Sequence, residues 1–292
     1  MRSPQRQRRK VAKAIIQPHE PLVTAAPPDH SVIREHLLAD PVRSGLFLDF
    51  DGTLMPFAGP VQNIVLTDEL LGNLGHLSEK LGTVGIVSGR PLAFLLRTFP
   101  VPGVRLAGVY GLEEWVEGRR QEAPGVAPWL PVIRKTVDEL RRTTSEFKGV
   151  EVRDKNVSVI VHWSGDADSP IGARISEITH ELEIRTGLRR QRGKSAEELL
   201  PPVPVDKGSV VRRICEEKAL TTALYIGDDL SDIPAFEAVH ELGGIAVAVD
   251  EQGRVPQPGL EALARDADFV LAGPAEVHRL LAALCDTLPV NR

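Results

Sequence analysis

Cysteine and aromatic residues are scarce in this chain of 292 residues. The two cysteines, Cys215 and Cys285, are too few for a disulfide framework or a structural zinc site. Aromatic residues make up 4% of the chain and leave few platforms on which nucleic-acid bases could stack. No apolar run approaches the ~18 residues of a membrane-spanning helix, and residues 1–20 lack the apolar stretch of a signal peptide. We therefore expect a cytoplasmic protein that binds neither nucleic acid nor a membrane.

Charge is distributed unevenly along the chain. Residues 1–13 carry six of the 35 Lys and Arg residues and no acidic residue, so the remainder holds 29 basic residues against 40 acidic ones. An acidic body is the opposite of what a nucleic-acid-binding face requires. We predict that residues 1–40 form a basic, flexible tail.

The pattern from residue 45 onward is typical of an α/β protein, and the length suggests about two domains at ~100 to 200 residues each. Short apolar runs alternate with amphipathic stretches, which predicts a parallel sheet flanked by helices. The predicted strands begin at Gly45, Thr83, Val104, Thr222, Gly244 and Phe269. The predicted helices cover residues 67–81, 90–99, 207–219 and 275–288.

Residues 124–202 have a different pattern. Two stretches with apolar residues at helical spacing flank an alternating run around residues 157–161, which predicts two helices against an open sheet. Proline clusters lie on either side of the segment, where linkers would be expected. We predict a core domain made of residues 41–123 and 203–292, with an inserted second domain at 124–202.

The strongest chemical signal is the run LFLDFDGTL, in which Asp49 and Asp51 follow an apolar strand. Carboxylates at positions i and i+2 point the same way at the carboxyl end of a strand, where open α/β sheets bind ligands. One carboxylate can attack a bound phosphoryl group and form an aspartyl phosphate. The other can give a proton to the departing alkoxide and take one from water. For the two residues by themselves, a structural turn or cap pair is an equal alternative.

Two further segments carry groups that can hold phosphate. Ser88 and Gly89 follow the predicted strand at 83–87, in a turn whose hydroxyl and backbone N–H groups can bind a phosphoryl oxygen. Lys207 lies in the predicted first turn of a helix, where its charge can neutralise the phosphoryl group and an attacking carboxylate. Each signal is weak alone, because Ser commonly caps helices and a lone lysine is usually exposed.

Acidic residues gather again after the strand that begins at Thr222. Asp228, Asp229 and Asp232 stand there without a Lys or Arg among them. Crowded carboxylates repel one another unless a cation lies between them, and Mg²⁺ prefers such oxygen ligands. The two acidic segments therefore predict a bound Mg²⁺.

In this order, the four segments resemble the motifs of the haloacid dehalogenase superfamily of phosphotransferases, over roughly residues 45–288. The resemblance implies a Rossmann-like parallel sheet core with an inserted α/β cap domain of the C2 type. It implies that Asp49 is the nucleophile and Asp51 the general acid and base. It assigns phosphate binding to Ser88, Gly89, Arg90 and Lys207. It assigns the metal to Asp49, the Asp51 carbonyl and Asp228, and the orientation of the metal's waters to Asp229 and Asp232.

The position of the insert narrows the substrate class that the resemblance implies. Asp49 and Ser88 are 39 positions apart, whereas Ser88 and Lys207 are 119 apart, so the insert follows the second motif. Superfamily members with an α/β cap at this point mostly hydrolyse small phosphorylated sugars, and the cap excludes water from the site. Phosphomutases usually carry their cap between the first two motifs, which argues against that reaction.

Shorter strings resemble the trehalose-6-phosphate phosphatase family. They are SGR at 88–90, GVYGLE at 108–113, RDK at 153–155, and VDKG followed by YIGDDLSDIPAF. This resemblance implies a Mg²⁺-dependent phosphatase that hydrolyses trehalose 6-phosphate to trehalose and phosphate through an aspartyl phosphate. It implies that Lys155, His162 and Glu198 of the cap contact the sugar. We expect the protein to be a monomer.

The chain departs from that family's usual residues at four positions. It has Tyr110 in place of His, Ser164 and Leu200 in place of Arg, and Ile233 in place of Glu. The departures lie on the sugar side, where polar groups discriminate steeply between substrates. A phosphatase for another glycosyl phosphate, such as sucrose phosphate or a glycosyl-phosphoglycerate, therefore stays open. A non-catalytic sugar-phosphate sensor is a further alternative, although such a relic would be expected to lose its catalytic residues first.

Overall fold

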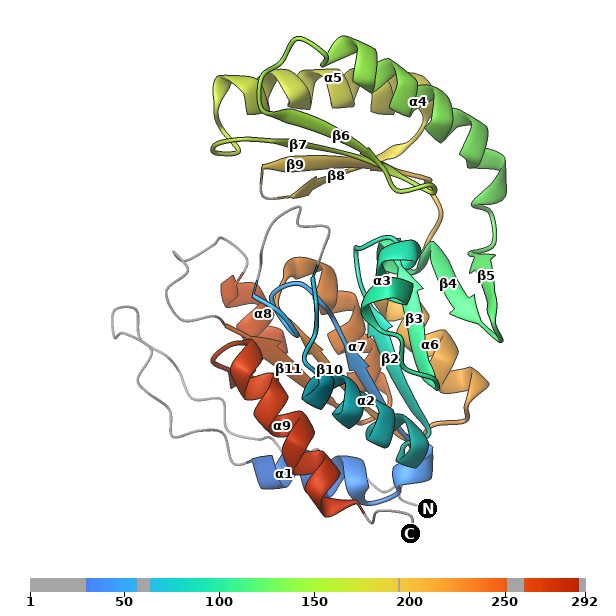
Figure 1. Ribbon diagram of the computed structural model, residues 1–292, viewed down its shortest axis with the longest axis vertical. Coiled ribbons are helices and arrows are strands. Elements are labelled where there is room, and N and C mark those ends of the chain that lie inside the picture. The colour runs from blue at the N-terminus through green and yellow to red at the C-terminus, as the bar shows by residue number, and fades with distance from the viewer. Residues whose placement is uncertain (1–29, 57–63, 194, 251–259, 289–292) are drawn as a thin grey trace, which may run out of the picture.

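The chain folds around a central sheet of mostly parallel strands (Figure 1). The computed structural model describes residues 30–56, 64–193, 195–250 and 260–288. The strands of this sheet are β1 (Ser44–Leu48), β2 (Thr83–Val87), β3 (Val104–Gly108), β4 (Glu113–Val116), β5 (Arg119–Glu122), β10 (Thr222–Gly227), β11 (Ile245–Val249) and β12 (Phe269–Leu271). Within the described residues their order is β12-β11-β10-β1-β2-β3-β4-β5, parallel as far as β3 and antiparallel beyond it. The predicted α/β class with a parallel core is confirmed.

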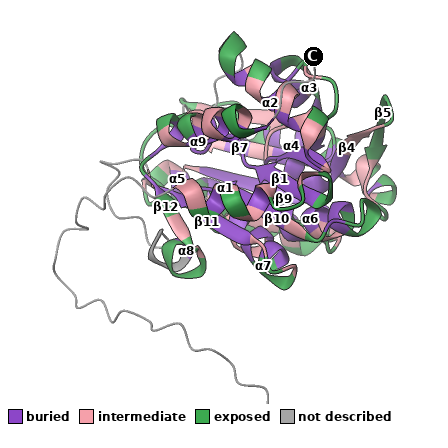
Figure 2. Ribbon diagram, turned by 90° about the horizontal axis from the view of Figure 1, so that it is seen from below, coloured by how far each residue is buried: buried purple, intermediate pink, exposed green. Residues whose placement is uncertain are grey.

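Helices cover both faces of the central sheet, because successive residues of a strand point to opposite sides. Leu46 and Leu48 of β1 pack on one side with α2 (Asp68–Lys80), α3 (Leu92–Thr98) and α9 (Pro274–Thr287). Phe47 packs on the other side with α6 (Lys207–Glu217), α7 (Ile233–Glu241) and α8 (Leu260–Asp266). Figure 2 shows the central strands buried between these helices. Burial on both faces is why these strands are continuous apolar runs in the sequence.

Helix α1 (His30–Leu38) corrects the expectation of a flexible tail. Ile33 and Leu37 are 1% exposed and belong to the apolar cluster that includes α2 and α9. The prediction of a flexible tail through residue 40 is therefore wrong for this helix, because apolar residues at positions i and i+4 give it a face to bury. Residues 1–29 of the predicted tail lie outside the described residues.

A second sheet lies over the carboxyl ends of the central strands (Figure 1). It consists of β6 (Val150–Asp154), β7 (Val159–Trp163), β8 (Arg189–Gly193) and β9 (Ala196–Leu200), in the antiparallel order β6-β7-β9-β8. Helices α4 (Leu130–Thr143) and α5 (Pro170–Thr186) pack on the face that points away from the core, against Val159 and Val161. The predicted pair of helices against an open sheet is confirmed, whereas the domain boundaries at 124 and 202 stay a prediction.

The longest helix in the described part of the chain is α5, with 17 residues. It begins after Ser169, whose side chain accepts a hydrogen bond from the Gly172 N–H, and it ends at Gly187 in the left-handed conformation. Neither α5 nor any other described helix combines the length and the apolarity that crossing a membrane would require.

Candidate active site

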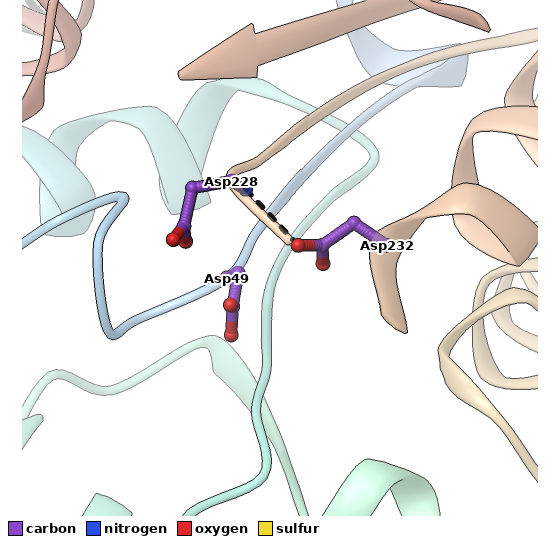
Figure 3. Close-up of side chains that lie close together, drawn as sticks. All are labelled: Asp49, Asp228 and Asp232. Carbon is purple, nitrogen blue, oxygen red and sulfur yellow. Dashed lines mark hydrogen bonds between the residues drawn. The ribbon is translucent and has the colours of Figure 1, made fainter. Parts of the chain in front are cut away.

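Three acidic side chains from two segments meet at the carboxyl edge of the central sheet (Figure 3). Asp49 follows β1, Asp228 follows β10, and Asp232 ends the short 3₁₀ helix η4 (Leu230–Asp232). One carboxylate oxygen of each lies within 4.8 Å of the others. They meet because β1 and β10 are parallel neighbours in the sheet and end at the same edge.

Lys207 lies between two of these carboxylates. Its Nζ is 2.9 Å from Asp49 Oδ2 and 2.7 Å from Asp232 Oδ1, and its side chain is 1% exposed. Helix α6 begins at this residue because Asp206 forms a capping box with Ser209 in the first turn. Burial lowers the pKa of Lys207, but the charges of Asp232 and Asp49 outweigh burial and raise it well above its usual value. The amine therefore stays a cation beside Asp49.

Asp232 is held by four hydrogen bonds. Its Oδ1 accepts from Lys207 Nζ at 2.7 Å and from the Tyr225 hydroxyl at 2.6 Å. Its Oδ2 accepts from the backbone N–H groups of Asp228 and Asp229, each at 3.0 Å. Asp232 therefore positions both Lys207 and the loop that carries Asp228.

The loops after β1 and β10 also bind each other. Thr53 Oγ1 donates to Asp228 Oδ1 at 3.0 Å. Gly52 has φ 84°, and a Cβ at this position would lie 1.9 Å from Asp228 Oδ2, so this approach requires glycine. Asp229 is directed to η4, where its Oδ1 accepts from the backbone N–H of Ser231 at 2.8 Å. The resemblance implies that Asp229 orients the waters of the metal, whereas in the structure its carboxylate caps η4.

The acidic cluster fits a divalent cation. Burial raises the pKa of Asp49 well above its usual value, although the charge of Lys207 lowers it. Burial, followed by the charges of Asp232 and Asp229, raises the pKa of Asp228 to about 8. A cation between these acids would favour their ionised forms, and oxygen ligands suit Mg²⁺. Asp49, Asp228 and Asp232 each offer one oxygen to such an ion, and the oxygens of Asp232 also accept hydrogen bonds.

Asp51 and the loop of residues 88–90 lie side by side. Arg90 Nε and Nη2 donate to Asp51 Oδ2 and Oδ1, each at 2.6 Å, and the guanidinium also lies 4.8 Å from the centre of the Phe94 ring. Ser88 is 1% exposed, and its Oγ accepts from the Arg90 N–H at 3.2 Å. The resemblance implies that Arg90 binds phosphate, whereas in this structure Arg90 donates two hydrogen bonds to the carboxylate of Asp51.

Lys155, which directly follows β6, contacts both the 88–90 loop and Glu198 of β9. Lys155 Nζ donates to the Gly89 carbonyl and to Glu198 Oε2, both at 2.9 Å. Glu198 is 2% exposed, and its Oε1 also accepts from Ser158 Oγ at 2.5 Å. The structure therefore brings together Lys155 and Glu198, which the sequence places 43 positions apart.

His162 lies on the same face of the second sheet, because Val161 and Trp163 on either side of it pack toward the helices. Burial lowers its pKa to about 4, and the charges of Arg153 and Lys155 act in the same direction. His162 is therefore neutral near pH 7 and can both donate and accept a hydrogen bond.

The four departures from the family's usual residues lie in different surroundings. Tyr110, in the turn after β3, has its hydroxyl 3.5 Å from Glu198 Oε2. Ser164 is exposed and Leu200 is fully buried in an apolar cluster. Ile233 begins α7, next to Asp232. Tyr110 is thus the departure that contacts the Lys155–Glu198 pair directly.

Three residues that support the site are not predicted from the sequence. Tyr225 and Thr53 hold Asp232 and Asp228, and buried Glu113 accepts from the Leu92 N–H at 2.6 Å, just after the 88–90 loop. A signal existed for Tyr225, since a lone hydroxyl in an apolar strand needs a partner. Thr53 and Glu113 gave no signal apart from their motifs, because their partners lie in other segments.

Comparison with known proteins identifies the family of this chain. The family model described as trehalose-phosphatase matches residues 47–265, a span that includes Asp49, Lys207 and Asp228. The chain belongs to the trehalose-phosphatase family. A trehalose-phosphate phosphatase of Mycobacterium ulcerans is 30% identical over 252 residues, which are 84% of this chain and 62% of that protein. The chain thus spans about three fifths of the length of this curated relative.

Solved structures share the fold of this trehalose-phosphatase family member. A crystal structure of a trehalose-6-phosphate phosphatase related protein has a TM-score of 0.70 and 25% identity, and the match covers 83% of this chain and 97% of that one. A haloacid dehalogenase-like hydrolase from Bacteroides thetaiotaomicron has a TM-score of 0.59 and 17% identity, over 82% and 99% of the two chains. The family resemblance and the fold that it implies are confirmed.

Proposed function

We propose that this chain is a Mg²⁺-dependent phosphatase that hydrolyses trehalose 6-phosphate to trehalose and phosphate through an aspartyl phosphate. The observation that carries the proposal is the buried contact of Lys207 with Asp49, at the sheet edge where Asp228 also lies. The names of the relatives support the choice of substrate. The chemistry follows from the side chains at this edge.

In the first step, a carboxylate oxygen of Asp49 attacks phosphorus, and the bond between phosphorus and the sugar oxygen breaks. Asp51 gives a proton to that oxygen, so that the sugar leaves as an alcohol. Lys207 offsets negative charge on Asp49 and on the phosphoryl group, and the hydroxyl of Ser88 with the N–H groups beside it holds a phosphoryl oxygen.

In the second step, Asp51 takes a proton from water, and the water oxygen attacks the phosphorus of the aspartyl phosphate. The bond from phosphorus to the Asp49 oxygen breaks, which restores the carboxylate and releases phosphate. A Mg²⁺ ion held by Asp49, Asp228 and the Asp51 carbonyl would supply positive charge to the phosphoryl oxygens. Lys155, Glu198 and neutral His162 bind hydroxyls of the sugar from the second sheet.

A phosphatase for another glycosyl phosphate is the second candidate. It is favoured by Tyr110, which contacts Glu198 where the family usually has a histidine. A sensor without catalysis is less favoured, because Asp49 and Lys207 still form the ion pair that the reaction uses. A sensor would bind the sugar phosphate without releasing phosphate from it.

The decisive experiment is a panel of sugar phosphates assayed for phosphate release, with Mg²⁺ and with EDTA. We expect release from trehalose 6-phosphate to exceed release from sucrose phosphate and glucose 6-phosphate, and EDTA to abolish it. Faster release from another glycosyl phosphate would show that trehalose 6-phosphate is not the preferred substrate, while the proposed mechanism would stand. Tight binding without any release would establish the sensor.

A further inference from the structure

The turn after β3 holds three consecutive residues in the left-handed region of the backbone. Val109, Tyr110 and Gly111 have φ angles of 47°, 60° and 98°. Glycine adopts this conformation freely, whereas valine and tyrosine are strained in it, and such strain persists where surrounding contacts impose it. Here the N–H groups of Val109 and Tyr110 donate to the carbonyls of Arg90 and Ser88, both at 2.9 Å. The turn is therefore fastened to the 88–90 loop.

The side chain of Tyr110 lies where the two sheets meet. A Cβ at Gly89 would be 2.9 Å from Tyr110 Cζ, so the glycine leaves room for the tyrosine ring. The hydroxyl is 3.5 Å from Glu198 Oε2, and the ring centre is 5.9 Å from Lys155 Nζ. Tyr110 thus contacts the 88–90 loop on one side and the Lys155–Glu198 pair on the other.

Charges from both sheets act on the Tyr110 hydroxyl. Burial raises its pKa well above the usual value, and the charges of Glu198 and then Asp229 raise it further, while Lys207 lowers it. The hydroxyl therefore keeps its proton and can donate a hydrogen bond. Because the ring lies against Gly89 and the hydroxyl is 3.5 Å from Glu198 Oε2, Tyr110 lies between the proposed phosphate-binding loop and the proposed sugar-binding residues.

The geometry points to Tyr110 as a specificity-determining residue. Its hydroxyl, with Lys155 and Glu198, recognises hydroxyls of the sugar ring next to the phosphate, and its ring limits the space beside the 88–90 loop. Histidine, which the family usually has in this turn, is shorter and carries no hydroxyl. This inference rests on the proposed function and deepens it, since it names a residue that chooses among glycosyl phosphates.

The test compares the wild-type protein with Tyr110→Phe and Tyr110→His on two kinds of substrate. One is the sugar phosphate that the wild-type protein hydrolyses with the highest kcat/KM, and the other is p-nitrophenyl phosphate, which has no sugar hydroxyl. We expect Tyr110→Phe to lower the ratio of kcat/KM for the sugar phosphate to kcat/KM for p-nitrophenyl phosphate by about tenfold. The loss should come mainly from a higher KM for the sugar phosphate. We expect Tyr110→His to change the order of preference among the sugar phosphates.

The ratio is insensitive to partial unfolding, because the same folded molecules hydrolyse both substrates. An unchanged ratio in Tyr110→Phe, whether or not both kcat/KM values fall, would overturn the inference while leaving the proposed function intact. If the wild-type protein hydrolyses p-nitrophenyl phosphate but no sugar phosphate, the inference is wrong and the phosphatase chemistry stands. If it releases phosphate from neither, the proposed function is wrong and the inference falls with it.

Discussion

Asp51 and Arg90 form a two-point contact that fixes the direction of the proposed acid and base. Both Asp51 oxygens accept from the guanidinium at 2.6 Å, and the Arg90 N–H is bound to Ser88 Oγ. A bidentate pair restricts a carboxylate more than a single hydrogen bond does. The acid and the loop that is proposed to hold phosphate are therefore positioned as one unit.

Replacing Asp51 should slow the first step strongly when the leaving group needs a proton, and only weakly when it does not. Asp51→Asn should slow release of phosphate from trehalose 6-phosphate by about 10²- to 10⁴-fold, the usual effect of a positioned acid and base. The initial release of nitrophenolate from p-nitrophenyl phosphate should fall much less, because nitrophenolate leaves without a proton. Stopped-flow and steady-state assays measure the two effects, with the exposed Asp138→Asn as the matched control. Equal losses on both substrates would remove Asp51 from its role.

His162 predicts a pH dependence of stability. Burial and the charges of Arg153 and Lys155 lower its pKa from 6.5 to about 4 in the folded protein. Between these values the unfolded chain binds the proton and the folded chain does not, so this residue destabilises the protein as the pH falls. The thermal midpoint should therefore drop less between about pH 7 and about pH 5 in His162→Gln than in the wild-type protein. Equal drops in the two proteins would mean that His162 is not held neutral.

Among the elements, α6 carries Lys207, and its position depends on a close approach to α7. A Cβ at Gly208 would lie 2.2 Å from the carbonyl oxygen of Pro234. Glycine at the start of α6 therefore lets the two helices touch through the backbone. This contact places the first turn of α6, and with it the amine beside Asp49.

Alanine at this glycine should destabilise the protein, although alanine favours helices elsewhere. Gly208→Ala should lower the free energy of unfolding by about 1 to 3 kcal/mol, the cost of overpacking a close contact. Gly72→Ala in α2 is the matched control, since Gly72 is exposed and a Cβ there meets nothing within 4 Å. It should raise the free energy of unfolding by about 0.5 to 1 kcal/mol. Urea titrations measure both, and a gain for Gly208→Ala would show that α6 and α7 are not in close contact.

The parallel strands are predictable from the sequence, whereas the edge of the sheet is not. Strands such as β2 are buried on both faces, so the sequence must be apolar throughout their length. The edge strand β5 consists of the polar residues RRQE and is mostly exposed (Figure 2), so its backbone pairing with β4 leaves no apolar signal. Helix α1 lies within residues 1–40, for which the basic run at residues 1–13 favours a flexible tail, so the burial of Ile33 and Leu37 is not predicted.

The same limit applies to the candidate site. Asp49, Ser88 and Asp228 are predicted to meet because parallel strands end at one edge. The two hydrogen bonds from Arg90 to Asp51 depend on side-chain directions in two separate loops. These directions cannot be predicted from the motif around Asp51 or from the motif around Ser88. The left-handed conformation of Tyr110 is equally hidden, because it is imposed by contacts with the 88–90 loop.

In the whole molecule, the two sheets divide the proposed work between them. The central sheet gathers the groups that act on phosphorus, and the second sheet carries Lys155 and Glu198 over the same edge. Contacts between them already exist at Gly89 and Tyr110. We propose that the phosphoryl group is transferred to Asp49 at this edge of the central sheet.

The most direct test of that claim traps the phosphoryl group on the protein. Asp51→Asn protein is mixed with p-nitrophenyl phosphate and Mg²⁺, quenched within the first turnover and digested for mass spectrometry. Nitrophenolate leaves without a proton, whereas breakdown of the aspartyl phosphate needs Asp51 to activate water, so the intermediate should accumulate. We predict one phosphoryl group on Asp49, absent when EDTA replaces Mg²⁺ and absent after Asp49→Asn. A phosphoryl group on another residue, or phosphate release with none on the protein, would contradict the assignment of Asp49.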